Sequence, residues 1–204
     1  MPHAATGMSE SKGAEGETLR AFVGVAPGST LRAALAQLRE ALARVNFGDG
    51  LRWVPAENLH LTLRFLGEVP RASLPALISA LRAAVNEHPT FQLPLEGIAL
   101  FPNVHRPRAL VATLPNPQPL EDLAAVVEAA VRGSGLPPER RRFRPHITLA
   151  RIRRGQHPGE VPEIPLEAPH LAVTRIALYR SVLADSGARY SILEDIALGE
   201  STAR

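Results

Sequence analysis

Hydrophobic positions along the chain fall into two patterns that predict different elements. Short continuous apolar runs, beginning with RAFVGV at 20–25, predict buried strands. Stretches in which apolar residues recur every three or four positions, beginning at 31–45, predict amphipathic helices, and a serine and a threonine just before this one offer N-caps. We expect further strands at 59–66, 93–101 and 108–113, after Pro145 and from His170, and further helices over 74–85 and 120–131. Pro94 and Gly97 interrupt one of these strands, which predicts an edge or a bulge there.

The second half of the chain repeats the first. RAFVGV begins 40 residues before His60, and RALVAT at 108–113 begins 38 residues before His146. The two histidines open the sequences HLTL and HITL, and an IALF sequence in the first half is echoed by IALY in the second. Three matched segments in the same order indicate an internal duplication.

The duplication predicts an α+β fold. Each copy contains a strand, a helix, a strand that begins with the histidine, and a further strand; the first copy has an extra helix where the second has a proline-rich loop at about 155–169. Two such lobes would pack about a pseudo-twofold axis, with antiparallel sheets flanked by helices and the two histidines facing each other across a central cleft. No linker separates the halves, so we expect 18–200 to form a single two-lobed domain, preceded by a disordered polar tail at 1–17.

Composition narrows the chemistry. The chain of 204 residues has no cysteine, which excludes disulfides and thiolate metal sites. Lys12 is the only lysine among 23 basic residues, and arginine binds phosphate through a planar fork of donors, so this bias is compatible with a phosphate-handling protein. No apolar run is long enough to span a membrane, and the N-terminus has no secretory pattern, so we expect a cytoplasmic protein.

The repeated His-x-Thr motif carries the candidate chemistry. Residues two apart in a strand point to the same side, so His60 shares a face with Thr62, and His146 with Thr148. One such motif is usually an ordinary surface strand, but two at equivalent positions of a repeat favour a shared site. Two imidazoles at one reaction centre can remove one proton and deliver another, and threonine hydroxyls can donate to charged oxygens. Phosphodiester cleavage without a metal fits this set.

The sequence resembles the two-histidine (2H) phosphoesterase family, in particular its LigT-like RNA 2′,3′-cyclic phosphodiesterase branch. Nearly the whole chain after Leu19 takes part in the resemblance. Besides the two motifs, the matching positions are Phe22, Trp53, Val54, Asn58, Phe65 to Gly67, Phe101 to Asn103, Phe143, Pro145, Arg151, Ser181, Leu183, Gly187 and Tyr190.

The resemblance implies hydrolysis of a terminal ribonucleoside 2′,3′-cyclic phosphate to a 2′-phosphomonoester, with the 3′ oxygen leaving. It implies roles for six residues: His60 as general acid, His146 as general base, Thr62, Thr148 and Arg151 as phosphate ligands, and Phe65 as a stacking surface for the base. Neither a metal nor another cofactor is expected. The expected partner is RNA with a cyclic phosphate end, or a small cyclic nucleotide, bound by a monomer that needs no other protein and no membrane.

Strand parity raises a question about two of these residues. Phe65 and Arg151 each lie five positions after their histidine, so strict alternation would turn them to the opposite face unless a bulge or the strand end redirects them. Arg64 has the matching parity and competes for phosphate contact in the first lobe.

Arginines cluster around the second motif. Seven of them fall within fifteen residues: Arg140, Arg141, Arg142, Arg144, Arg151, Arg153 and Arg154. This cluster is either a solvated basic loop or an electrostatic guide for an RNA terminus. Among the other five histidines, His105 is a candidate for substrate contact, and no His-x-His or HExxH pattern predicts a metal site.

Three alternatives stay open at this point. The same histidine pair could join RNA ends through a 2′,5′ bond, with a ribose hydroxyl replacing water. Small cyclic nucleotides or ADP-ribose cyclic phosphates could be the substrates. A non-catalytic RNA-end binder could also keep the cleft, although a pure binder needs no pair of proton carriers.

Overall fold

A computed structural model describes residues 17–45, 47, 49–115, 117–164, 170–184 and 187–199. Its α-helices are α1 (Ser29–Arg44), α2 (Leu74–Val85) and α3 (Gln118–Gly133), with 3₁₀ turns at Ala56–Asn58 and Arg71–Ser73. Its strands are β1 (Thr18–Val25), β2 (Leu51–Trp53), β3 (Leu61–Pro70), β4 (Phe91–Pro94), β5 (Gly97–Phe101), β6 (Ala109–Thr113), β7 (Ile147–Ile152), β8 (His170–Val173), β9 (Arg175–Ala184) and β10 (Gly187–Ala197). The expected α+β class is therefore confirmed. Most of the tail expected at 1–17 lies outside the described residues.

Three helices lie where the spacing predicts them, with one difference at the first. Helix α1 has Gly28 at its N-cap and no side-chain cap, so the prediction that Ser29 or Thr30 caps it was wrong. The helix begins one residue earlier than a serine cap would allow, and Ser29 is already helical. The buried face is as expected, with Leu31, Leu35, Leu38 and Leu42 all in the core.

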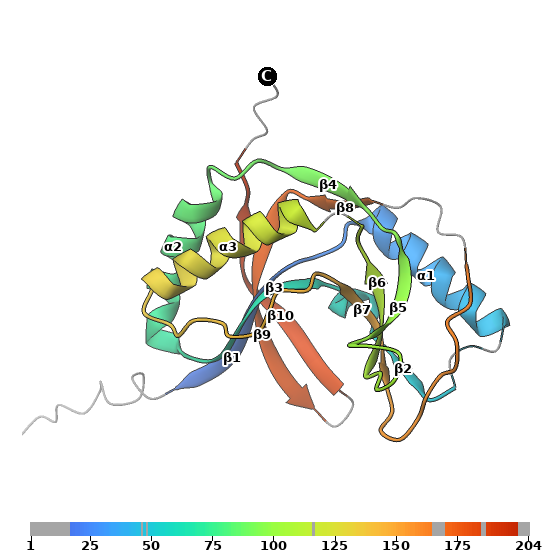
Figure 1. Ribbon diagram of the computed structural model, residues 1–204. Coiled ribbons are helices and arrows are strands. Elements are labelled where there is room, and N and C mark those ends of the chain that lie inside the picture. The colour runs from blue at the N-terminus through green and yellow to red at the C-terminus, as the bar shows by residue number, and fades with distance from the viewer. Residues whose placement is uncertain are drawn as a thin grey trace, which may run out of the picture.

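The main sheet reflects the duplication in its strand order. Eight strands form it, in the order β10-β9-β1-β3-β7-β6-β5, with β2 paired to β7 outside this path. We call β10, β9, β1 and β3 the His60 lobe, and β7, β6, β5 and β2 the His146 lobe. The lobes meet where β3 pairs with β7, and in Figure 1 they slope away from this junction on either side. Outward from the junction, β3, β1 and β9 correspond to β7, β6 and β5, as a pseudo-twofold axis requires, while β10 has no counterpart in this order.

The two halves of the chain exchange their last strands. Strand β5 comes from the first half but pairs with β6 in the His146 lobe, and β9 comes from the second half but pairs with β1 in the His60 lobe. The segments IALF and IALY, which lie in β5 and β9, therefore hold equivalent places in opposite lobes. Each lobe is complete only when both halves of the chain contribute to it.

The interrupted strand expected at 93–101 is two strands in two sheets. Pro94 ends β4, and Gly97 begins β5. Strand β4 pairs with β8 in a separate two-stranded sheet, whereas β5 joins the main sheet. The proline and glycine thus mark a crossing between sheets rather than a bulge within one strand.

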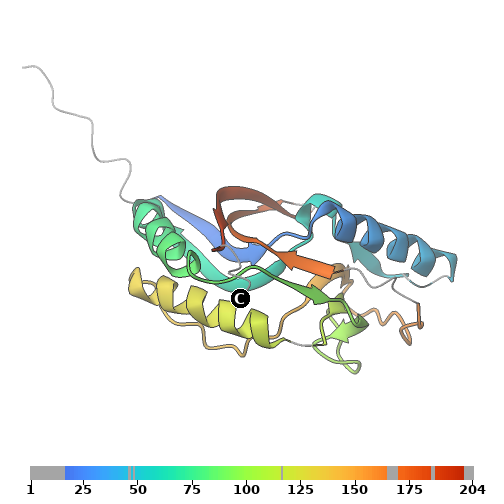
Figure 2. The same ribbon diagram turned by 90° about the horizontal axis from the view of Figure 1, so that it is seen from above.

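The helices complete the packing on either side of the junction. Helices α2 and α3 run side by side at the end of the molecule opposite α1 (Figure 2), and α3 packs on β3. On the other side Arg39 of α1 lies over the ring of Trp53 in β2. Buried leucines and valines of the helices and strands form one continuous core, which fixes the strands that carry the two histidines. No helix in the described part of the chain is long and apolar enough to cross a membrane.

Candidate active site

The two histidine motifs meet at the junction of the lobes. Leu61 of β3 pairs with Ile147 of β7 in antiparallel register. Each histidine is the residue just before its strand, so extending the register by one position sets His60 level with Thr148 and Thr62 level with His146. The pair Leu61 and Ile147 thus lies at the pseudo-twofold axis, and the four motif residues surround it.

Both histidines are held by the same backbone contact. Nδ1 of His60 lies 2.7 Å from the carbonyl oxygen of Asn58, and Nδ1 of His146 lies 2.7 Å from that of Arg144. A carbonyl oxygen only accepts, so each Nδ1 carries the proton and donates it. In the neutral ring Nε2 is then left with a lone pair, and in the charged ring it carries a second proton. The same contact therefore prepares either ring to accept or to donate a proton at Nε2.

The threonines next to the histidines have hydroxyls available for a ligand. Thr62 and Thr148 are both half-buried. Within the described ranges neither hydroxyl has a hydrogen-bond partner from the protein. Each can therefore donate to an oxygen placed between the lobes.

A β-bulge at the same place in each lobe redirects the fifth residue after the histidine. Gly24 pairs with Thr62 but Val23 pairs with Arg64, so Leu63 is skipped; Leu149 is skipped in the same way on β7. The six residues that follow each histidine are, in order, buried, half-buried, buried, buried, exposed and half-buried. Two consecutive buried residues break the alternation, so the next residue returns to the side of the threonine. The expected bulge is confirmed.

Phe65 and Arg151 are the two residues that the bulge turns back. Both are exposed and hold equivalent positions on β3 and β7. The structure therefore puts an aromatic ring and a guanidinium at matching places on the side of the sheet that carries the threonines.

The bulge also settles the position of Arg64, and the prediction that it competes for phosphate was wrong. Its side chain is buried and points to the helix side, where it pairs with Glu128 of α3 and donates to the carbonyls of Phe65 and Pro137. Glu139 lies 3.6 Å from the same guanidinium. Strict alternation would place Arg64 on the same face as Thr62. The bulge at Leu63 interrupts the alternation, so Arg64 points to the opposite face. Arg64 is a structural residue that ties β3 to α3.

The electrostatic environment lowers the pKa of both histidines. Burial is the largest cause for His60, and the positive charges of Arg151 and His146 act in the same direction, opposed by the bond to the Asn58 carbonyl. Burial also lowers the pKa of His146 most, followed by Arg151 and Arg144, opposed by the bond to the Arg144 carbonyl. Arg151 is therefore close enough to act on both rings. The structure brings His60, His146 and Arg151 together from the two lobes.

Aromatic side chains surround His60, and sequence reasoning gave none of them a role. The ring centroid of His60 lies 4.7 Å from that of Phe22, 5.0 Å from Tyr190 and 5.9 Å from Tyr179. Phe22 and Tyr179 in turn stack at 4.7 Å. One signal was present in the sequence, because Tyr179 ends the repeated IALY segment and Phe101 ends IALF.

His146 has a different neighbourhood. Its ring stacks on Phe101 at 4.3 Å, and the guanidinium of Arg144 lies 4.6 Å from the centre of the same phenyl ring. The His146 site thus pairs one aromatic ring with a nearby cation, where the His60 site has three aromatic rings.

The ring of Phe65 already has a cation over it. Cζ of Arg141 lies 5.1 Å from the ring centroid, and Arg141 is held there by two hydrogen bonds to Glu139, of 3.1 and 2.8 Å. These bonds to Arg141 lower the pKa of Glu139 to about 2. A gap of this size does not admit a base between the guanidinium and the ring, so a base stacks on Phe65 only if Arg141 moves aside or caps the base.

The arginine cluster divides into three groups in space. Five of the seven belong to these groups: Arg141 and Arg144 lie over Phe65 and Phe101, the charge of Arg151 acts on both histidines, and Arg153 and Arg154 line a cavity beyond the end of β7. His105 lines the same cavity. Across the described ranges no group of three or more histidines and carboxylates is arranged to hold a metal ion.

Comparison with known proteins agrees with this geometry. The model of the LigT-like phosphoesterase family matches residues 25–111 and 113–190. An RNA 2′,3′-cyclic phosphodiesterase of Thermus thermophilus is 36% identical over 193 residues, which are 88% of this chain and 90% of that protein.

Two solved structures are similar throughout. The crystal structure of TT0787 of Thermus thermophilus is 32% identical, covers 90% of this chain and 100% of its own, and has a TM-score of 0.73. The crystal structure of E. coli LigT complexed with 3′-AMP is 29% identical, covers 89% of this chain and 99% of its own, and has a TM-score of 0.74. With its two His-x-Thr motifs at the junction of two duplicated lobes, this chain belongs to the LigT-like phosphoesterase family.

Proposed function

We propose that this protein is an RNA 2′,3′-cyclic phosphodiesterase that hydrolyses a terminal cyclic phosphate to a 2′-phosphomonoester without a metal. One observation carries the proposal: two histidines from opposite lobes share the same Nδ1 contact, which leaves Nε2 of each ring to exchange a proton. Relatives with this name, one of them 36% identical, support the choice of RNA ends as substrate.

The proposed reaction needs one neutral and one protonated histidine. Nε2 of His146 accepts a proton from water as the water oxygen attacks phosphorus, and the bond from phosphorus to O3′ breaks as Nε2 of His60 donates its proton to that oxygen. The products are a 2′-phosphate and a free 3′-hydroxyl. A second turnover requires a proton to pass from His146 to His60, through solvent or the product.

The surroundings of the rings favour this division of roles. Arg144 and Arg151 both act on His146, and two nearby cations favour its neutral form, which a base needs. His60 lies among three aromatic rings, whose faces attract a cation, as an acid needs. Burial, Arg151 and His146 lower the pKa of His60 as well, and we propose that Phe22, Tyr179 and Tyr190 offset these effects.

The other predicted residues complete the proposed site. Thr62 and Thr148 donate to the two non-bridging oxygens, and Arg151 stabilises the negative charge that grows on them in the transition state. Phe65 stacks on the terminal base, which gives loose base preference because every base has an aromatic face.

An assay of end products tests the function. An oligoribonucleotide ending in a 2′,3′-cyclic phosphate, incubated with the protein and a chelator, should give a 2′-phosphomonoester. Formation of a longer RNA instead would indicate 2′,5′ ligation, and tight binding without turnover would indicate an RNA-end binder. Loss of activity on chelation would contradict the metal-free mechanism.

We further propose that residues 18–200 act as one domain, as a monomer in the cytoplasm. Both histidines and both lobes come from one chain, so a partner subunit is not needed to complete the site. A molar mass above 22.0 kDa by light scattering in the presence of substrate would argue against the monomer.

A further inference from the structure

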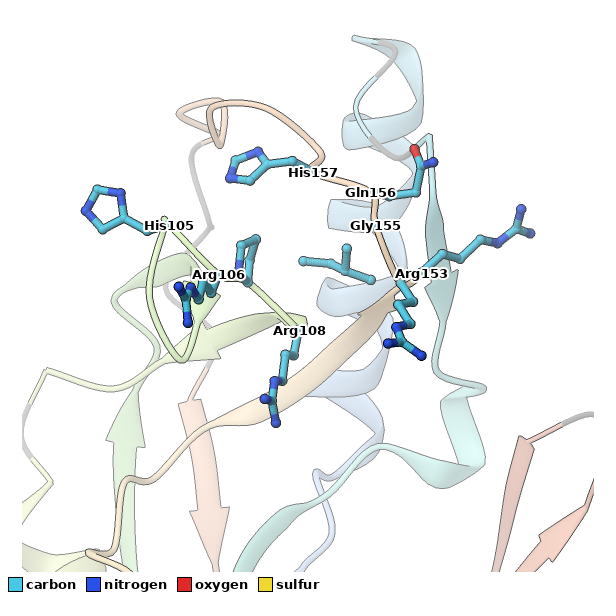
Figure 3. A pocket seen from close by; sticks show the side chains of 10 residues that line it. His105, Arg106, Arg108, Arg153, Gly155, Gln156 and His157 are labelled. Carbon is cyan, nitrogen blue, oxygen red and sulfur yellow. The ribbon is translucent and has the colours of Figure 1, made fainter.

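A basic cavity lies beyond the outer end of the His146 lobe, away from the histidines. Its volume is about 650 Å³, and its walls are the loop before β6 and the loop after β7 (Figure 3). Its lining residues are His105, Arg106, Pro107, Arg108, Ile152, Arg153, Arg154, Gly155, Gln156 and His157. Four of the ten are arginine and none is acidic, so the cavity suits an anion.

Unlike the ion-paired arginines of the molecule, these four have no carboxylate beside them in the described part of the chain. Arg64, Arg71 and Arg175 are each ion-paired with a carboxylate. Within the described ranges none of the four cavity arginines forms an ion pair, and all four are exposed. Unneutralised guanidinium groups around one cavity favour a ligand with several negative charges.

The cavity is also fixed by contacts between its walls. Nε2 of His157 donates to the carbonyl of Val104 at 2.7 Å, which joins the two loops, and Nδ1 of the same ring accepts from the backbone of Gly159 at 3.1 Å. The backbone of Arg153 bonds the carbonyl of Gly50 at 2.9 Å. Gly50 has a positive φ of 79°, and a Cβ there would lie 2.9 Å from the side chain of Gln156, so only glycine fits this contact without a shift.

The position of the cavity relates it to the histidine site. Strand β7 leads from His146 towards the cavity and ends at Ile152, one residue before Arg153. Arg153 lies seven positions after His146, a span of up to about 23 Å at the rise of a strand. A single nucleotide held at the histidines does not reach so far, whereas the following part of an RNA strand does.

We propose that this cavity binds backbone phosphates of the RNA upstream of its cyclic phosphate end. The cavity has several uncompensated guanidinium groups but no Phe, Tyr or Trp among its lining residues, so it recognises phosphates rather than stacking on bases. This inference rests on the proposed function, because it assigns the second contact region of the same substrate.

The test compares a short and a long substrate in one pair of variants. The double variant Arg106→Ser/Arg153→Ser removes two cavity charges. The control Arg71→Ser/Arg132→Ser removes two exposed arginines near α2 and α3, far from the cavity. Hydrolysis is measured with a nucleoside 2′,3′-cyclic phosphate and with an eight-nucleotide RNA ending in the same group.

For the cavity variant we expect kcat/KM to fall by roughly tenfold on the eight-nucleotide RNA and to stay unchanged on the single nucleotide. For this variant, the slope of log kcat/KM against log salt concentration should become shallower by roughly 1 to 1.5, because two contacts to phosphates of a single strand are lost. The variant Arg106→Lys/Arg153→Lys should keep most of the activity on the long RNA, because lysine still binds phosphate as a point charge.

Three results would overturn the inference: an unchanged kcat/KM on the long RNA, an equal loss on both substrates, or the same loss in the control. Binding separates this inference from the proposed function. If the wild-type protein hydrolyses neither substrate, the function fails, and fluorescence anisotropy with the same RNA ending in a 2′-phosphate still decides the inference. Equal affinities of wild type and cavity variant would then reject it.

Discussion

His60 and His146 hold equivalent positions in the two lobes, yet the side chains around them differ. Each ring donates from Nδ1 to the carbonyl two residues earlier, and each lies at the start of a bulged strand. Around His60 are Phe22, Tyr179 and Tyr190, whereas His146 has Phe101 and the charge of Arg144. The backbone thus provides two like proton carriers, and the side chains that line each lobe distinguish them.

The same contrast runs along the two bulged strands. Arg64 and Ala150 are equivalent buried positions, one charged and one apolar, while Phe65 and Arg151 are equivalent exposed positions, one aromatic and one charged. A duplicated backbone therefore fixes where a side chain points and leaves its chemistry free. Substitutions at matched positions are therefore the most direct test of the role that each lobe has in catalysis and binding.

The largest effect is expected from the histidines. His60→Ala and His146→Ala should each lower kcat by roughly 10²–10⁴-fold, because each removes one proton transfer from the transition state. The double variant should be little worse than either single one, since the pair acts as a unit. The measurement is single-turnover hydrolysis, with thermal unfolding to show that the variants fold.

A modified substrate should separate acid from base. When sulfur replaces the 3′ oxygen, the leaving thiolate needs no proton, so His60→Ala should recover much of its lost rate while His146→Ala should not. Recovery of the His146 variant instead would exchange the two roles.

The next effect contrasts the residues that the bulges turn back. Arg151→Ala should lower kcat by roughly 10²-fold, because its contact strengthens as charge grows on the phosphate. Phe65→Ala should mainly raise KM, by roughly tenfold, because stacking holds the base equally in ground and transition states. Steady-state kinetics resolves the two, with Arg151→Lys and Phe65→Tyr as matched controls. A change in Arg151→Ala confined to KM contradicts its proposed role.

A third effect concerns stability rather than rate. Arg64→Ala should lower the free energy of unfolding by about 3 kcal/mol, because it leaves Glu128 and the part-buried carbonyls of Phe65 and Pro137 without their donor. Urea denaturation measures this change. Since Arg64 faces the helices, KM for the cyclic phosphate should stay the same, and a raised KM would restore Arg64 as a phosphate ligand.

The smallest effect is a shift of the pH profile. Burial and Arg151 lower the pKa of both histidines below the usual 6.5. The singly protonated pair is most populated between the two lowered values, so kcat/KM should peak on the acid side of 6.5. An optimum above that value would mean that the rings are less buried in solution than they are here.

The same pKa shifts give a sign for stability. Between each lowered folded value and 6.5 the unfolded chain binds more protons than the folded one, so the free energy of unfolding rises with pH across that window. Stability is therefore lost as the pH falls from 6.5 through the folded values. Thermal unfolding of the wild type against His60→Gln/His146→Gln should show this loss only in the wild type.

Sequence reasoning reached the parts of the molecule that depend on local spacing. Helical periodicity gave α2 over the expected residues, and the repeat identified both histidines. Parity also required either a bulge or a strand end, because Phe65 and Arg151 could not otherwise share a face with the threonines, and the structure has the bulge. These features need only information from neighbouring positions.

What the sequence could not predict depends on contacts between distant positions. The partner of Arg64 lies 64 residues away in α3, and nothing near Arg64 indicates it. Likewise the pairing of β9 with β1 brings Tyr179 beside Phe22, although 157 positions separate them in the chain. Such contacts are decided by how sheets and helices pack, which local spacing does not encode.

The exchange of strands between lobes has a consequence for how the protein is made. A ribosome delivers β1 and β3 early, but their lobe waits for β9 and β10, which follow every other strand in the described part of the chain. Until then one edge of β1 is unpaired, and an open edge is a site for wrong association between nascent chains. The first lobe to be synthesised is thus the last to be finished, and His60 gains Tyr179 and Tyr190 as neighbours only after β9 and β10 have been synthesised.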